Sequence, residues 1–196
     1  MTGTLLYLRS RRVPLALAAA IGGVAVVWAL WLAFAEERDA SAMTVVMTVV
    51  LMVAALASTL GGPDENLDRT ASMRWPWRRA AHLLAAFLVV LAALLATRHT
   101  GARFGPAALV ARDAAGLLGL TALGATVFGT ARSWFLPLAW TTVAALYPQG
   151  GTWGAAATWQ GQPPGSRVAA LTAAVFAVGG LVAYSIAGPA RREPAE

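Results

Sequence analysis

The sequence VPLALAAAIGGVAVVWALWLAFA, from Val13 to Ala35, contains no charged residue over 23 positions. A helix needs about 20 apolar residues to cross the hydrocarbon core of a bilayer. The apolar core of a cleaved signal peptide is shorter, at about 7–15 residues. Trp28 and Trp31 lie toward the end of the segment, and tryptophan anchors helices at the membrane interface. The segment therefore predicts a transmembrane helix.

Five further apolar segments follow this one along the chain. They extend from Ser41 to Leu60, Ala80 to Thr97, Ala107 to Phe128, Trp134 to Tyr147 and Val168 to Ala187, and the fifth of the six is the shortest. Hydrophobic residues make up 58% of the chain and charged residues 12%, against roughly 45–50% and 25% in soluble domains. We therefore expect an all-α polytopic membrane protein with six transmembrane helices in a single domain, residues 1–196.

The arginines gather in every second linker, which indicates the orientation of the chain. If both termini are cytoplasmic, that side holds Arg9, Arg11, Arg12, Arg69, Arg74, Arg78, Arg79, Arg132, Arg191 and Arg192, and the other side holds Arg38, Arg98, Arg103, Arg112 and Arg167. Lys and Arg near helix ends are retained in the cytoplasm, so we expect both termini there. All fifteen basic residues are arginine, and Ala, Gly and Pro are abundant. This bias is typical of GC-rich bacterial genomes and predicts the bacterial cytoplasmic (inner) membrane.

Several classes of function are excluded by composition. The absence of cysteine excludes disulfides and thiolate sites, and the absence of lysine excludes an ordinary phosphate-binding P-loop and a retinal Schiff base. His82 and His99 are about 25 Å apart on one helix, at 1.5 Å per residue, and cannot share a metal. No catalytic constellation is present. We therefore expect that the chain is not an enzyme and that it binds no cofactor or metal itself. Its net charge of +6 is expected to interact with anionic lipid headgroups rather than with nucleic acid.

The two ends of the chain are basic. Residues 1–12 combine Leu5, Leu6 and Leu8 with nearby arginines. This pattern is typical of a short amphipathic helix in the cytoplasmic interface, and an ordinary positively charged tail is the alternative. Residues 188–196 are expected to form a cytoplasmic tail.

The linker from Gly61 to Arg79, GGPDENLDRTASMRWPWRR, is the largest expected cytoplasmic loop and carries both charges. Tryptophan and arginine are enriched at protein interfaces, so the loop predicts a docking element for a cytoplasmic partner. The alternative is a solvated loop whose arginines set the topology and whose tryptophans anchor in lipid. The candidate partner-binding residues are Asp64, Glu65, Asp68, Arg69, Arg74, Trp75 and Trp77.

The outer linker over residues 148–167, PQGGTWGAAATWQGQPPGSR, contains an apolar stretch from Thr152 to Gln160. This stretch is too short to span a bilayer, and it has Trp153 and Trp159 near its ends. It predicts a re-entrant or interfacial helix, provided that its backbone is buried in protein or lines a cavity. An exposed loop with two interfacial tryptophans is the alternative.

Arg112 and Asp113 form the one ionisable pair that enters an expected membrane segment. Such residues are by default candidates for a functional site, for example a proton relay. Because the pair lies only about six residues into its helix, an ion pair at the level of the interface is the alternative.

Small residues recur at four-residue spacing within several segments. Ala115 and Gly119 lie in the fourth segment, and Ala169, Ala173 and Ala177 lie in the sixth. Such faces let helix backbones approach closely. We expect most of them to pack within the chain and some to join another subunit.

A basic N-terminal segment before six helices, a charged loop at residues 61–79 and a Trp-containing outer loop at residues 148–167 together resemble the membrane subunit of an ABC-2-type transporter. The stretch ARDAAGLLGLTALGATVFGTARSWFLPL, from Ala111 to Leu138, is also similar to permease segments from GC-rich bacteria. The resemblance covers the whole chain, which at 196 residues is smaller than most such permeases. It implies a connecting helix at the N-terminus, a coupling helix in the 61–79 loop and re-entrant helices in the outer loop.

The same resemblance implies the partners. A separate cytoplasmic ATPase would bind ATP and Mg²⁺, and a second permease subunit, identical or a sibling, would complete the transporter. Export is the commoner direction in this family, and the sequence does not select a cargo. Two other functions stay open: the substrate-binding membrane component of an energy-coupling-factor vitamin importer, against which the charged 61–79 loop argues, and a non-transporting membrane scaffold or protective protein.

Overall fold

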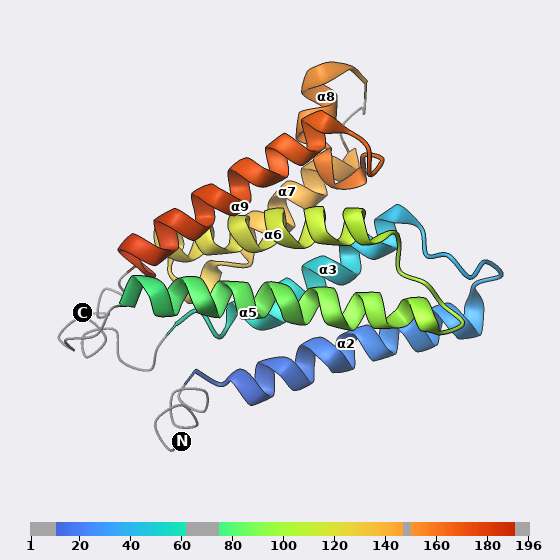
Figure 1. Ribbon diagram of the computed structural model, residues 1–196, viewed down its shortest axis with the longest axis horizontal. Helices are drawn as coiled ribbons and strands as arrows, with labels where there is room; N and C mark the ends of the chain where they lie inside the picture. The colour runs from blue at the N-terminus through green and yellow to red at the C-terminus, as the bar shows by residue number, and fades with distance from the viewer. Residues whose placement is uncertain (1–10, 62–74, 147–149, 191–196) are drawn as a thin grey trace.

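The structure is a computed structural model that describes residues 11–61, 75–146 and 150–190, and these residues form helices joined by short turns (Figure 1). The helices are α2 (Val13–Phe34), α3 (Ala42–Ala57), α5 (Trp75–Ala96), α6 (Ala107–Phe128), α7 (Phe135–Leu146), α8 (Gly151–Ala157) and α9 (Arg167–Ala187), with single 3-10 turns η1 (Thr97–His99), η2 (Thr130–Arg132) and η3 (Trp159–Gly161). The all-α prediction is confirmed. The expected interfacial helix, most of the 61–79 loop and most of the C-terminal tail lie outside the described residues.

Four of the described helices are long and apolar enough to cross a membrane: α2, α5 with η1, α6 and α9, with 21 to 25 residues each. They indicate a membrane-embedded protein. Each of the six apolar segments contains a helix, but α3 has only 16 residues and α7 only 12. At 1.5 Å per residue these two helices are about 24 and 18 Å long, against a hydrocarbon core of about 30 Å. Six complete crossings therefore stay a prediction.

Helix α5 begins five residues earlier than the sequence predicted. The expected start was Ala80, because Arg78 and Arg79 were assigned to the loop, whereas the helix begins at Trp75. Pro76 occupies its first turn, where a missing backbone N–H costs nothing because that N–H has no helical acceptor. Trp75 and Trp77 are therefore residues of a helix rather than of the loop.

The helices run back and forth between two ends of the bundle. Arg11 and Ala190 lie at one end, with the C-terminus of α6 and the N-terminus of α5, and we call this the terminal end (left in Figure 1). The α2–α3 loop and the α5–α6 loop lie together at the other, which we call the hairpin end (right in Figure 1). The short helix α8 projects beside the N-terminus of α9.

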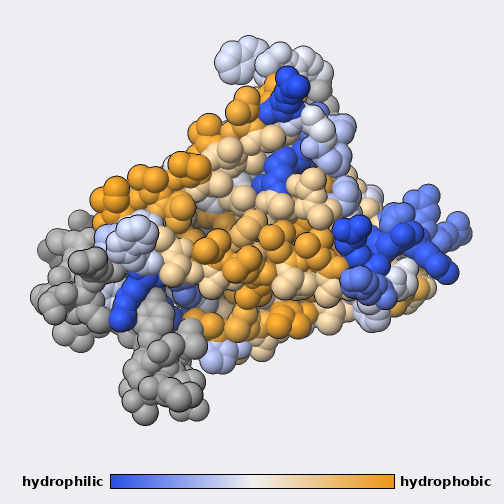
Figure 2. Space-filling model, viewed as in Figure 1, coloured by the Kyte–Doolittle hydropathy of each residue, from blue (hydrophilic) through white to orange (hydrophobic). Residues whose placement is uncertain are grey.

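Helices α3 and α6 form the centre of the bundle. In the most apolar window of α6, 72% of the residues are buried, against 17–28% in α2, α5 and α9. Valines at positions 45, 46, 49 and 53 of α3 are also buried. The outer helices instead expose large apolar side chains, and Figure 2 shows an apolar surface between two hydrophilic ends. Such a surface suits lipid as the surrounding solvent.

Helices α6 and α9 approach each other closely, and glycine residues at their contact make this approach possible. A Cβ added at Gly119 would lie 2.1 Å from the carbonyl oxygen of Phe176, and one added at Gly180 would lie 2.1 Å from the carbonyl oxygen of Gly119. The predicted small-residue faces of these two helices thus pack against each other within the chain. Gly180, which completes the contact, was not among the predicted residues.

Candidate functional site

The Arg112–Asp113 pair is buried inside the bundle, in the second turn of α6. The Nε of Arg112 donates to Oδ1 of Asp113 at 2.9 Å, and the two side chains are 6% and 0% exposed. The pair is enclosed by protein, where each charge depends on the other. Its depth in a membrane, as a functional pair or as an ion pair at the level of the interface, stays a prediction.

Arg112 also joins α6 to the outer linker. Its Nη2 donates to the carbonyl oxygen of Gln160 at 3.0 Å, and its Nη1 donates to that of Pro163 at 3.1 Å. A guanidinium has five N–H donors and can serve several acceptors at once. The first carbonyl lies in η3 and the second just after it, so the arginine supplies hydrogen bonds that a longer helix would otherwise provide. One side chain therefore connects Asp113 to the outer segment.

The outer segment turns back onto the bundle after α8. Trp159 is 0% exposed, and its ring lies against Gly116, where a Cβ would come within 2.4 Å of it. Trp140 fixes the same segment by donating from Nε1 to the carbonyl oxygen of Ala157 at 3.0 Å. Trp153, by contrast, is 86% exposed. The structure thus separates the two tryptophans that the sequence treated alike, and only Trp159 belongs to the core. The position of this segment in a membrane stays a prediction.

Polar atoms without a hydrogen-bond partner gather in this part of the chain. Of the six such buried side-chain atoms in the described residues, four are here: Oδ2 of Asp113, Nε1 of Trp159 and both polar atoms of the Gln160 side chain. The other two, Nε1 of Trp75 and Oγ of Ser185, lie at the terminal end. Unpaired polar groups are costly when buried. The four atoms provide carboxylate and amide oxygens as acceptors and indole and amide N–H groups as donors, a set that can hold a proton or a small polar molecule. Among the same residues no three His, Cys, Asp or Glu side chains gather as a metal site would require.

At the terminal end, Leu60 is held from two directions immediately before the charged loop. Arg11 donates from Nη1 to its carbonyl oxygen at 3.3 Å, and the Tyr184 hydroxyl donates to the same oxygen. Arg11 also lies 6.0 Å from the ring centroid of Trp75, the first residue of α5. The residues that flank the 62–74 loop are thereby tied to the segment before α2 and to α9.

Two further polar contacts fasten α5 at this end. Arg79, which is buried, donates from Nη1 to the carbonyl oxygen of Ser185 at 3.4 Å, and its guanidinium lies over Gly188 at the C-terminus of α9. A cation at this position is stabilised by the negative end of the helix dipole. Nε2 of His82 and Oγ1 of Thr59 share a hydrogen bond of 2.8 Å. The sequence predicted neither contact: Arg79 was assigned to the loop, and His82 was considered only as a metal ligand. Polar residues at the same end of adjacent apolar segments were the available signal.

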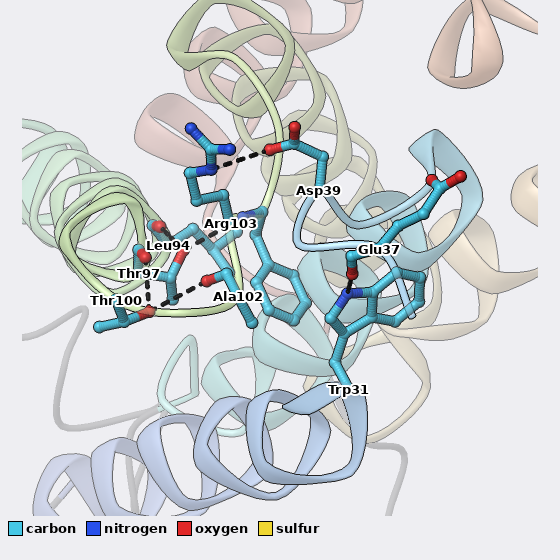
Figure 3. A network of polar contacts seen from close by, with 9 residues as sticks. Trp31, Glu37, Asp39, Leu94, Thr97, Thr100, Ala102 and Arg103 are labelled. Carbon is cyan, nitrogen blue, oxygen red and sulfur yellow. Dashed lines mark hydrogen bonds and ion pairs between the residues drawn. The ribbon is translucent and has the colours of Figure 1, made fainter. Parts of the chain in front are cut away.

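At the hairpin end, polar contacts join the two loops (Figure 3). Asp39 and Arg103 form an ion pair at 3.1 Å, and the backbone of Arg103 exchanges hydrogen bonds with Arg38 and Ala40 at 2.8 Å each. Trp31 donates to the carbonyl oxygen of Glu37 at 2.9 Å. The side chain of Arg103 is 49% exposed and that of Asp39 is 72% exposed. Ion pairs that are this exposed contribute little to stability. The sequence placed Arg38 and Arg103 on one side of the membrane, and they do share one end of the bundle.

Comparisons with known proteins identify no relative of this chain. No family model matches the chain, and neither the curated proteins nor the solved structures include a match. The class of protein therefore follows from the fold alone: the described residues form an all-α protein, and four of their helices are long and apolar enough to span a bilayer, which indicates a membrane-embedded protein.

Proposed function

We propose that this protein is the permease subunit of an ATP-driven transporter of the ABC-2 type. Its terminal end would face the cytoplasm of a bacterium, and a separate ATPase subunit would bind ATP and Mg²⁺. A second permease subunit, identical or a sibling, would complete the pathway, and export is the commoner direction in such systems. The observation that carries the proposal is the anchoring of both flanks of the 62–74 loop to the bundle.

This anchoring supports a mechanical role for the loop. Before the loop, Leu60 is bonded to Arg11 and Tyr184; after it, Arg79 in the first turns of α5 is bonded to Ser185 of α9. A displacement of the loop therefore pulls on α2, α5 and α9 together, since buried hydrogen bonds do not readily yield. A permease without a P-loop must receive its work from a partner in this way.

Partner docking through the loop can be tested by charge reversal. The double substitution Asp68→Arg with Arg69→Glu is expected to reduce the recovery of the ATPase that co-purifies with the wild-type protein in detergent. Like charges placed together at an interface cost several kcal/mol, which corresponds to a loss of about tenfold or more. The apolar spans are unchanged, so the helices should still insert.

The matched control reverses a second pair of charges on the same expected side, with Arg191→Glu and Arg192→Glu. It should leave ATPase recovery near the wild-type level. Equal recovery with both double variants would refute the loop as the docking site. Equal recovery together with the absence of ATP-dependent flux would favour the scaffold function instead.

The orientation can be tested with reporter cysteines, since the chain has none of its own. Asp39→Cys and Gly161→Cys, both at exposed positions, are expected to react with a membrane-impermeant maleimide added to intact cells. Ser72→Cys should react only after the cells are permeabilised, because the positive-inside rule places its loop in the cytoplasm. Labelling of Ser72→Cys in intact cells would show that the topology is the opposite one. The loop could then not bind a cytoplasmic ATPase.

A further inference from the structure

A lateral groove of about 420 Å³ opens between α5 and α9, with α6 as its floor. Ala115 and Gly119 form the floor, Ala81 and Leu84 line the α5 side, and Ala177 and Leu181 line the α9 side. Figure 2 shows the apolar surface that covers this region of the bundle. The volume lies within the range of about 300–1,000 Å³ that small-molecule sites occupy. Its lining is apolar throughout, so the groove suits a hydrocarbon rather than a polar ligand.

The joining of α5 to α9 argues against a third helix between them. Packed helices keep their axes about 8–10 Å apart, and an inserted helix would have to separate α5 from α9. These two helices are joined at the terminal end by the hydrogen bond from Arg79 to Ser185, at 3.4 Å. A flexible chain of methylene groups needs no such separation.

The terminal end of the groove is amphipathic and basic. Trp77 lines the groove at this end and is 73% exposed, as expected for a residue at a membrane interface. Arg78 is exposed and lies three residues before Ala81, on a neighbouring part of the helix surface. Arg79 is engaged at the C-terminus of α9, whereas Arg78 is exposed and available to a ligand.

No described acid lies at this end of the groove to neutralise Arg78. Residues 11–61, 75–146 and 150–190 contain four acids. Glu36, Glu37 and Asp39 lie in the loop at the hairpin end, and Asp113 is buried in α6, close to the same end. An exposed cation at this position is complementary to an anionic headgroup at the membrane surface.

We propose that this groove binds one acyl chain of an anionic phospholipid whose phosphate is bound by Arg78. The apolar lining accommodates the chain, Trp77 lies at the boundary between chain and headgroup, and Arg78 provides the preference for negative charge. This site belongs to the chain itself and does not depend on whether an ATPase drives transport.

Native mass spectrometry of the purified chain tests the site. The delipidated protein is titrated with phosphatidylglycerol and, separately, with phosphatidylcholine of the same acyl chains. We expect one phosphatidylglycerol to be retained at about fivefold lower lipid concentration than phosphatidylcholine, which is the factor that one arginine beside an anionic headgroup contributes.

Two variants with matched controls separate the headgroup from the chain. Arg78→Gln should abolish the preference for phosphatidylglycerol, whereas Arg98→Gln, an exposed arginine at the hairpin end, should preserve it. Ala177→Leu fills the groove and should weaken the retention of both lipids about tenfold. Ala174→Leu, on the exposed face of the same helix, should not. Because Arg78→Gln alters only an exposed side chain, the headgroup test stands even if Ala177→Leu does not fold.

Equal retention of the two lipids by the wild-type protein would overturn the proposal. An unchanged preference in Arg78→Gln would also overturn it. A wild-type dimer that Ala177→Leu converts to monomers, without a change in lipid retention, would assign the groove to a second copy of the chain and would equally refute the lipid site.

Discussion

Gly180→Leu is expected to destabilise the folded protein strongly, whereas Gly179→Leu leaves its stability nearly unchanged. A Cβ at Gly180 would lie 2.1 Å from the carbonyl oxygen of Gly119, and a backbone atom cannot rotate away as a side chain can. Overpacking typically costs about 1–3 kcal/mol of folding stability. We expect a collision with backbone atoms to cost about 3 kcal/mol or more. At Gly179 an added Cβ meets nothing within 4 Å.

The comparison is made by thermal unfolding in detergent, followed by size-exclusion chromatography of the heated samples. For a chain of this size, 1 kcal/mol shifts Tm by about 2–4 °C, so Gly180→Leu should lower Tm by about 10 °C or fail to yield a monodisperse protein. Adjacent positions in α9 receive the same side chain, so helix propensity and added hydrophobicity are matched. Similar losses at both positions would show that the α6–α9 approach is not the stabilising contact.

The helices could be predicted from the sequence because apolar segments of sufficient length have few alternatives in a membrane. Their ends were harder to place. Arg78 and Arg79 were assigned to a loop because charge is usual at helix ends, but both belong to α5, which is described from Trp75. The short α7 could be recognised as the shortest segment, whereas α3 was predicted at full length and ends at Ala57. Ser58 and Thr59 follow it, and their hydroxyls bond to carbonyls of its last turn.

The contacts at the site were only partly predictable. The pairing of Arg112 with Asp113 follows from their adjacency, but the other acceptors of Arg112 are the main-chain carbonyls of Gln160 and Pro163. A carbonyl is present in every residue, so its role depends on the tertiary fold and leaves no mark on the sequence. The same holds at the terminal end, where Leu60 and Ser185 accept through their backbones.

Arg112→Met is expected to be strongly destabilising, because it leaves the carboxylate of Asp113 buried without its charged partner. Removal of one member of a buried ion pair costs about 3–5 kcal/mol. The substitution also removes the hydrogen bonds that hold the outer segment at Gln160 and Pro163. Arg103→Met breaks the exposed pair with Asp39 and should cost at most about 1 kcal/mol. Thermal unfolding of the two variants under the same conditions measures the difference.

The double variant Arg112→Met with Asp113→Asn distinguishes the lost ion pair from the lost packing. Asparagine has nearly the shape of aspartate and no charge, so it removes the penalty of an unpaired carboxylate, and a buried pair replaced as a whole can be close to neutral. We expect the double variant to recover at least about half of the stability that Arg112→Met loses, which a double-mutant cycle reads as a coupling free energy of about 1.5–3 kcal/mol. Additive losses in the two single variants would mean that the charge of the Asp113 carboxylate does not depend on Arg112. The main contribution of Arg112 to stability would then be its hydrogen bonds to the outer segment.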